Sequence, residues 1–203
     1  DEQWDRACEA TGRVSSNARF KLIHYNYLHR TYLTPKTLHR FDPSRSASCP
    51  RCTSPDAHFM HLAWECQKVQ SFWVDVVKTL NQITGWNQNP DPRKCLLGDI
   101  RPKKGHKVLF KFTHLALAKR RVAITWMGTN GPDIDKWRRD TMEWAVAEEQ
   151  RLKKCRKDDK LTADLKTWND MLDITIGKIS TEITPEQSDE DNDGNNSTNN
   201  NIE

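Results

Sequence analysis

Three of the six cysteines and one histidine lie within eighteen residues of one another. Cys49 and Cys52 enclose a Pro-Arg pair, His61 follows after eight residues and Cys66 after four more, which gives C-x2-C-x8-H-x4-C. A Cys-x-x-Cys turn presents two thiolates to one ion from a single bend, and Cys3His is a closed four-coordinate ligand set of structural zinc. The spacing therefore predicts one structural Zn2+ site.

The second half of this motif poses a geometric problem. His61 and Cys66 are five residues apart, so on one continuous helix they would be separated by roughly 140°. We therefore expect a short helix beginning around Asp56, a break at residues 64–65 and a new helix from Cys66. His58 is the alternative nitrogen ligand, since it shares a helix face with His61. The four-residue gap before Cys66 favours His61, because that gap recurs in zinc-knuckle modules.

The alternative interpretation of Cys49 and Cys52 is a redox pair or two plain thiols. A redox Cys-x-x-Cys normally opens a helix after a strand, in a thioredoxin-like context. Residues 41–48 instead form a polar Pro/Ser-rich segment, which favours the metal site. The remaining cysteines are isolated and are expected to be ordinary thiols: Cys8, Cys95 and Cys155.

Composition and charge set limits on the class of protein. The chain has 203 residues, of which 35% are hydrophobic and 30% charged, and its eight tryptophans must supply much of the buried surface. We expect two modest helical clusters with a marginal core supported by metal. Residues 1–181 hold 32 basic and 21 acidic residues, a formal charge of +11. Such a charge suggests a polyanionic partner, RNA or DNA, although solubility alone would also account for part of it.

Apolar periodicity predicts a mainly α-helical protein. Helical spacing extends over residues 17–30, 69–80, 106–127, 134–145 and 161–172, and Thr34-Pro35 is a favourable helix start. The helices at 106–127 and 134–145 are expected to expose a basic face opposite their apolar stripes. The residues predicted to contact phosphate on this face are Lys111, Lys119, Arg120, Arg121, Arg138 and Arg139.

These segments divide the chain into five parts. We predict an N-terminal flank (1–17), a small helical zinc-binding unit (18–86), a linker with a short apolar turn around Gly98 (87–105), a basic helical segment (106–178) and a disordered acidic, Asn-rich tail (179–203). No apolar run reaches the eighteen residues that span a bilayer, and the acidic N-terminus is unlike a signal peptide. We therefore expect an intracellular protein of the nucleus or cytoplasm that is not secreted and has no membrane partner.

Catalytic signatures are missing from the sequence. A polymerase needs paired carboxylates on a buried hairpin to hold two Mg2+ ions, whereas the only such pair, Asp158-Asp159, lies in the charged run RKDDK. There is no Gly-rich phosphate loop and no nucleophile elbow. We expect that this chain alone is not an enzyme and has no small-molecule substrate.

Six short motifs occur in a fixed order between residues 29 and 126. They are HRTYLTP (29–35), SCPRC (48–52), HLAWEC (61–66), Phe72-Trp73, Leu96-Leu97-Gly98 and LALAKRRVAITW (115–126). In that order and at those separations they resemble the zinc-binding region that follows the polymerase domain in reverse transcriptases of non-LTR, LINE-type retrotransposons. The resemblance covers about residues 18–145.

The resemblance implies a Cys-Cys-His-Cys zinc module at Cys49, Cys52, His61 and Cys66. It also implies that the module helps the parent reverse transcriptase to bind element RNA or target DNA during target-primed reverse transcription. Thr53 departs from the family, which often has Gly after the second cysteine, so the tightness of that turn is in question. The alternative function is a non-catalytic scaffold that uses zinc to hold a helical domain against the polymerase or another protein.

Overall fold

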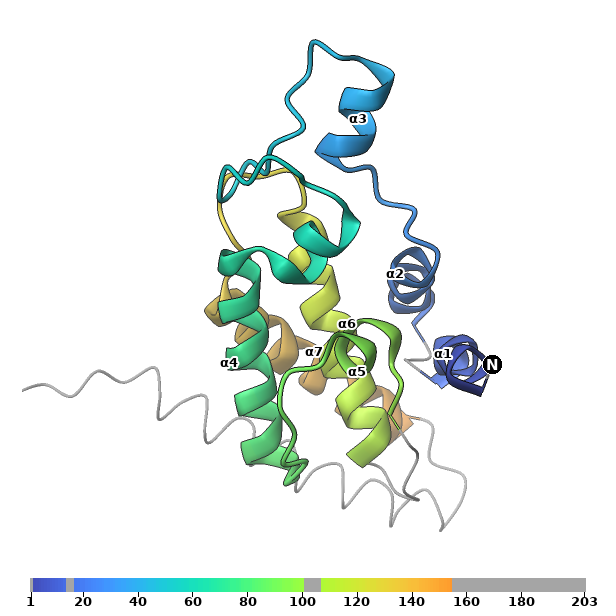
Figure 1. Cartoon of the computed structure of the whole chain (residues 1–203). Coiled ribbons are helices and arrows are strands. Elements are labelled where there is room, and N and C mark those ends of the chain that lie inside the picture. Colours follow the sequence, from blue (N-terminus) through green and yellow to red (C-terminus); the bar gives the residue numbers. More distant parts are fainter. Residues whose placement is uncertain (1, 14–16, 101–106, 155–203) are drawn as a thin grey trace, which may run out of the picture.

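The computed structural model describes residues 2–13, 17–100 and 107–154, and within these ranges the chain forms helices and loops without strands. Figure 1 shows the helices in chain order: α1 (Glu2–Arg13), α2 (Ala18–Leu28), α3 (Pro35–Phe41), the π-helical turn η1 (His61–Glu65), α4 (Gln67–Thr84), α5 (Pro92–Leu97), α6 (Lys107–Ile124) and α7 (Ile134–Lys154). The predicted mainly α-helical class is confirmed. The predicted helix at 161–172 and the acidic tail lie outside the described residues.

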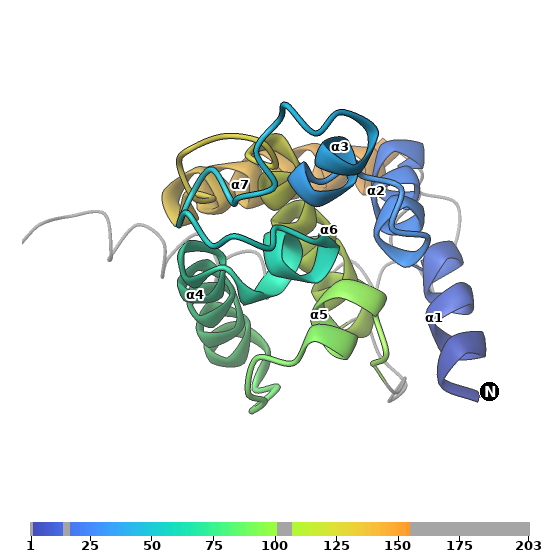
Figure 2. The same cartoon turned by 45° about the horizontal axis from the view of Figure 1, so that its top comes forward.

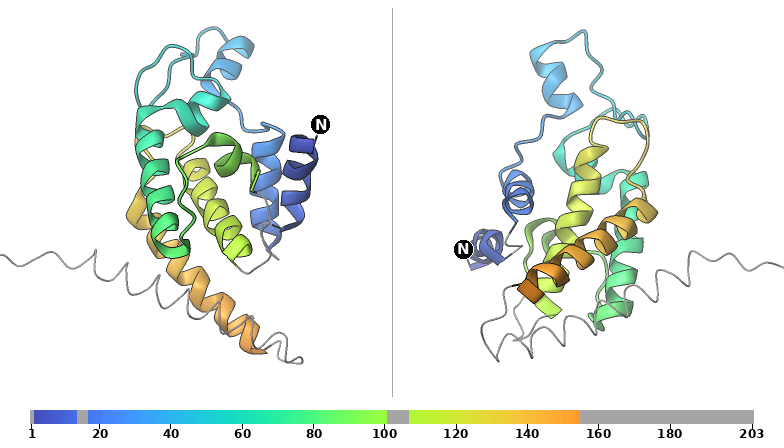
Figure 3. Two further views of the ribbon diagram at one scale, coloured as in Figure 1. Left: turned by 60° about the horizontal axis from the view of Figure 1, so that its bottom comes forward. Right: turned by 180° about the vertical axis from the view of Figure 1, so that it is seen from behind.

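Helix α6 is the centre of the fold and packs against α2, α4, α5 and α7. Figures 2 and 3 show it enclosed by these neighbours. Every side chain from Phe112 to Lys119 is buried, so this part of α6 has no solvent face. One hydrophobic core runs from Phe20 on α2 to Trp137 on α7. The two helical clusters expected from the sequence therefore share a single core.

Helix starts and ends follow local sequence signals. Asn17 caps α2 by accepting a hydrogen bond from the Arg19 N–H, and Thr34 caps α3 by accepting one from the Thr37 N–H. Helix α4 ends at Gly85, whose φ of 62° lies in the left-handed region that glycine tolerates. The apolar stripe predicted for this segment is buried in α4: Val69, Phe72, Trp73, Val76, Val77 and Leu80.

The two segments predicted to be a flank and a linker both contribute to the packed structure. Residues 2–13 form α1, which packs against α2 and is joined to the rest of the chain by a 2.9 Å ion pair between Arg6 and Asp99. Residues 92–97 form α5, which places Cys95 and Leu96 in the core. Helix α3, in contrast, stands apart from the packed helices in Figure 1.

Candidate metal centre

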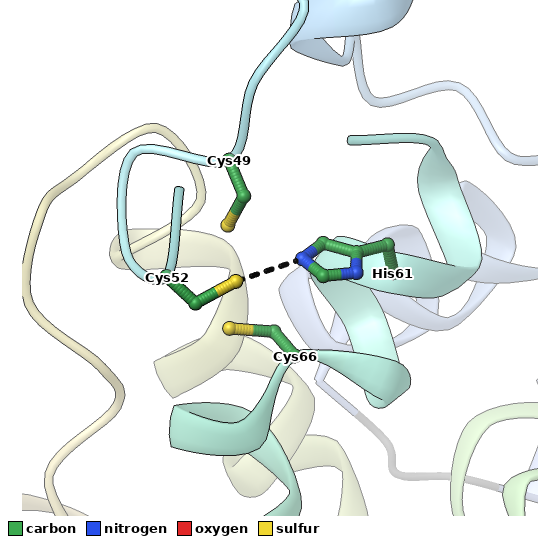
Figure 4. A group of neighbouring side chains, drawn as sticks. All are labelled: Cys49, Cys52, His61 and Cys66. Carbon is green, nitrogen blue, oxygen red and sulfur yellow. Dashed lines mark hydrogen bonds between the residues drawn. The ribbon is translucent and has the colours of Figure 1, made fainter. Parts of the chain in front are cut away.

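The first two cysteines lie in a tight turn that precedes η1. The Thr53 N–H donates to the Cys49 carbonyl at 2.9 Å, and the Cys49 N–H donates to the Ser54 carbonyl at 2.8 Å. These two backbone bonds close the loop over Pro50 and Arg51. They hold the side chains of Cys49 and Cys52 toward the same point, as Figure 4 shows.

A wide helical turn places the other two residues of the motif. The Cys66 N–H donates to the His61 carbonyl at 2.9 Å, a bond between residues five apart that defines a π-turn. Because a π-turn holds more residues than an α-turn, residues five apart lie closer to one face than the 140° of a regular helix allows. The chain then turns at Cys66, which has a ψ of 127°, and α4 starts.

This arrangement confirms the break predicted before α4 and corrects two details. The break falls at Cys66 itself rather than at residues 64–65, and the preceding helical turn begins at Phe59 rather than around Asp56. The break falls later because η1 is a π-turn, whose closing hydrogen bond from the Cys66 N–H to the His61 carbonyl carries the turn as far as Cys66. At the junction of η1 and α4, the ring centroids of Trp64 and Trp73 lie 5.5 Å apart. The indole N–H of Trp73 donates to the Ala63 carbonyl at 3.0 Å.

The four side chains form a compact group of the right size for a metal ion. One ligand atom from each of Cys49, Cys52, His61 and Cys66 lies within 4.8 Å of all the others. The Cys52 Sγ and His61 Nε2 atoms are 3.3 Å apart (Figure 4). A tetrahedral zinc ion has bonds of about 2.3 Å to sulfur and 2.0–2.1 Å to nitrogen, so its ligand atoms lie roughly 3.6–3.8 Å apart. The group therefore fits one tetrahedral ion with shifts of an ångström or less.

His58 is excluded from this group because both of its ring nitrogens are engaged elsewhere. Its Nδ1 accepts a hydrogen bond from the His61 N–H at 3.1 Å, and its Nε2 lies 3.4 Å from the Glu65 carboxylate. The imidazole of His58 thus supports the η1 turn from outside. Of the two candidates, His61 is the one that the structure brings to the cysteines.

The protonation of the group suits metal binding. Burial lowers the pKa of His61 below its usual value, which favours the neutral imidazole that a metal requires. Burial acts to raise the pKa of Cys52, but hydrogen bonds from the Ser54 N–H and from the neighbouring thiols outweigh it and lower that pKa. Burial raises the pKa of Cys66. An ion that supplied positive charge would favour the thiolate form of all three cysteines.

Arg51 is part of this centre, although its role could not be read from the motif. Its side chain is buried and donates to three carbonyls, Leu62 at 2.9 Å, Thr125 at 2.7 Å and Trp126 at 3.1 Å. The cysteine turn is thereby fixed both to η1 and to the C-terminal end of α6, where a cation is favoured by the helix dipole. A divalent ion held by three thiolates would have a net charge of −1, which the nearby positive charge of Arg51 would offset.

Thr53 occupies a backbone position that normally requires glycine. Its φ is 60°, in the left-handed region, where a β-branched residue is strained by about 1–2 kcal/mol. The turn nevertheless closes, as the bond from the Thr53 N–H to the Cys49 carbonyl shows. A threonine at this position is therefore a cost in stability, and the side chains of Cys49 and Cys52 still converge.

The predicted basic face is wrong at Lys119. This residue is 2% exposed, and its Nζ contacts the His24 Nδ1 and the Leu96 carbonyl inside the core. Desolvation lowers the pKa of Lys119 to about 7 and that of His24 to about 3. Because residues 112–119 of α6 are buried on all sides, helical periodicity alone could not identify a solvent face here. We therefore withdraw Lys119 as a phosphate contact.

The other residues of that face are largely engaged within the protein. Arg120 and Arg121 both pair with Asp140 of α7, the former at 3.1 Å. Arg138 pairs with Asp135 at 3.1 Å, and the Lys111 ammonium lies 5.1 Å from the Trp86 ring centroid. Arg139 is exposed. The carboxylate that pairs with Arg120 and Arg121 comes from α7, about twenty positions along the chain, whereas Asp135 lies only three positions from Arg138.

Two further observations bear on the identity of the chain. None of the helices in the described ranges combines the length and apolar character needed to cross a membrane. No protein-family model matches the chain.

Proposed function

We propose that this chain is a zinc-stabilised nucleic-acid-binding module of a LINE-type reverse transcriptase, which helps to hold element RNA or target DNA for target-primed reverse transcription. The observation that carries the proposal is the convergence of Cys49, Cys52, His61 and Cys66 on one point, within 4.8 Å. These four residues lie in two of the six motifs that carry the resemblance to retrotransposon reverse transcriptases, SCPRC and HLAWEC.

The donor set favours a structural zinc ion. Three sulfurs and one imidazole are soft and borderline ligands, which suit zinc better than magnesium or calcium. Four protein ligands complete a tetrahedron and leave no position for water or substrate, so the ion would have no catalytic role. By joining the cysteine turn, η1 and the start of α4, it would contribute its binding energy directly to folding.

The excess of positive charge supports a nucleic-acid partner. Residues 1–181 carry a formal charge of +11, and binding that neutralises phosphates releases counterions, which makes the affinity depend on salt. A scaffold that packs against the polymerase is the second candidate. It is favoured by one observation, the pairing of Arg120 and Arg121 with Asp140 inside the protein, which leaves these two side chains less available to phosphates.

Two measurements test the proposal. Native mass spectrometry of protein prepared without chelator should show one zinc ion per chain, and chelation should reduce helicity. Filter binding of the zinc-loaded chain to RNA and to single-stranded DNA at 50 and 200 mM salt should show an affinity that falls as salt rises. A metal-free spectrum would contradict the zinc site, whereas a zinc-loaded chain that binds neither nucleic acid would favour the scaffold.

A further inference from the structure

We infer that single-stranded nucleic acid binds along α2, the 29–34 loop and α3, rather than on the α6–α7 surface that the sequence predicted. We refer to this region as the α2–α3 surface and define it by Arg19, Lys21, Tyr25, Arg30, Arg40 and Phe41. The inference rests on the nucleic-acid-binding function proposed above and locates it on the molecule.

The first argument is the balance of charge. From Asn17 to Cys52 the chain has seven basic residues and one carboxylate, Asp42. Three of the seven are used internally: Lys36 pairs with Asp56 at 2.9 Å, Arg45 pairs with Asp42 at 3.3 Å and Arg51 is buried on backbone carbonyls. The four others have no carboxylate partner among the described residues: Arg19, Lys21, Arg30 and Arg40.

Along the chain, exposed rings lie close to these four cations. Tyr25 and His29 stack with ring centroids 4.2 Å apart, and Tyr25 is 48% exposed. Phe41, at the end of the projecting helix α3, is 69% exposed, and the Arg40 guanidinium lies 5.4 Å from its ring centroid. Exposed rings near cations that lack a carboxylate partner are the combination used by proteins that bind single strands, with bases stacking on the rings and phosphates contacting the cations.

The same features favour single strands over a duplex or a protein. An aromatic side chain can stack only on a base that is not already stacked on its neighbours. The bases of a duplex are stacked, and separating them costs free energy. An acidic protein would use the cations but would gain less from the flat faces of Tyr25 and Phe41. The α6–α7 surface is a weaker candidate, since Lys119 is buried and Arg120 and Arg121 share Asp140.

The charge test compares two fourfold variants by fluorescence anisotropy, using labelled 16-nucleotide oligo(U) and oligo(dT) between 50 and 200 mM salt. The first variant changes Arg19, Lys21, Arg30 and Arg40 to Gln. The matched control makes the same change of charge on α4 and α7, at Lys68, Lys78, Lys136 and Lys154. Each lost phosphate contact lowers the slope of log K against log[salt] by about 0.7. The slope of the first variant should therefore be lower by roughly two to three, and that of the control by less than one.

The stacking test removes the rings with Tyr25→Ala and Phe41→Ala, and the control removes exposed side chains of α4 and α7 with Val74→Ala and Val146→Ala. The double ring variant should bind oligo(U) and oligo(dT) at least about 30-fold more weakly, since each lost stack costs about 1–3 kcal/mol, with an unchanged salt slope. The control should bind like the unaltered protein. Because all four positions are exposed, zinc content and helicity should stay constant.

The outcomes separate the location from the function. If the unaltered chain binds neither oligonucleotide at 50 mM salt, the proposed nucleic-acid function falls, and the location with it. If the unaltered chain binds but the salt slope falls equally in the two fourfold variants, only the α2–α3 location is overturned. Binding would then depend on the overall positive charge rather than on one surface. Equal affinity for a 16-base-pair duplex and for oligo(dT) would overturn the stacking role of the rings.

Discussion

Replacing Lys119 by methionine should abolish a rise in stability between pH 7 and pH 9. The ammonium of Lys119 is buried on α6, and its pKa falls from 10.5 to about 7 because burial penalises the charged form. Above pH 7 the folded chain has therefore lost this proton while the unfolded chain keeps it. Since the unfolded state binds more protons in this window, stability must increase with pH.

The size of the effect follows from the two pKa values. At pH 7 the buried amine costs on the order of 4 kcal/mol relative to an exposed lysine, and at pH 9 about 2 kcal/mol. The unaltered chain should thus gain about 2 kcal/mol from this residue over that range. In Lys119→Met the gain disappears, although the variant also loses the bonds to the His24 ring and the Leu96 carbonyl. Those losses shift stability by an amount that does not depend on the titration of Lys119.

Urea unfolding followed by circular dichroism at pH 7, 8 and 9 measures the effect. The comparison between the unaltered chain and Lys119→Met cancels the titration of other groups, including Tyr27 and Cys95, whose pKa values burial raises. Lys78→Met, at an exposed position of α4, is the matched control and should leave the pH dependence unchanged. If the unfolding free energy of Lys119→Met instead rises with pH as much as that of the unaltered chain, the amine of Lys119 reaches solvent and the reasoning is refuted.

Three further predictions concern the metal centre. His61→Ala should lose zinc and His58→Ala should keep it, as measured by metal content after gel filtration; loss of zinc only from His58→Ala would contradict the ligand assignment. Thr53→Gly should be more stable than Thr53→Ala by about 0.5–1 kcal/mol in thermal unfolding, because only glycine tolerates the φ of 60°. Equal stability of those two variants would argue against the left-handed turn. Arg51→Met should cost about 2–4 kcal/mol, because three buried carbonyls lose their donor, and it should release zinc at lower chelator concentration; normal zinc retention would show that the guanidinium does not support the site.

Local rules were sufficient wherever a residue acts within its own segment. The helix start at Thr34 and the buried stripe of α4 both depend on neighbours within a few positions. The four side chains that converge in the candidate metal centre were also predictable, because chelation by a short motif requires fixed residue types at fixed spacing. For the same reason His61 could be preferred to His58 before the structure was known.

Only the tertiary structure decided which charges reach solvent. Lys119, Arg120 and Arg121 are consecutive in sequence, yet the first is enclosed by α2 and α5 while the other two pair with Asp140 of α7. Helical periodicity identifies one apolar stripe, but it cannot tell that a central helix is covered on every side. The roles of Arg51, whose acceptors lie up to 75 positions away, and of α1, which docks on α2, were hidden for the same reason. Burial and pairing of a charge depend on residues brought together by folding, and a single sequence does not state which residues those are.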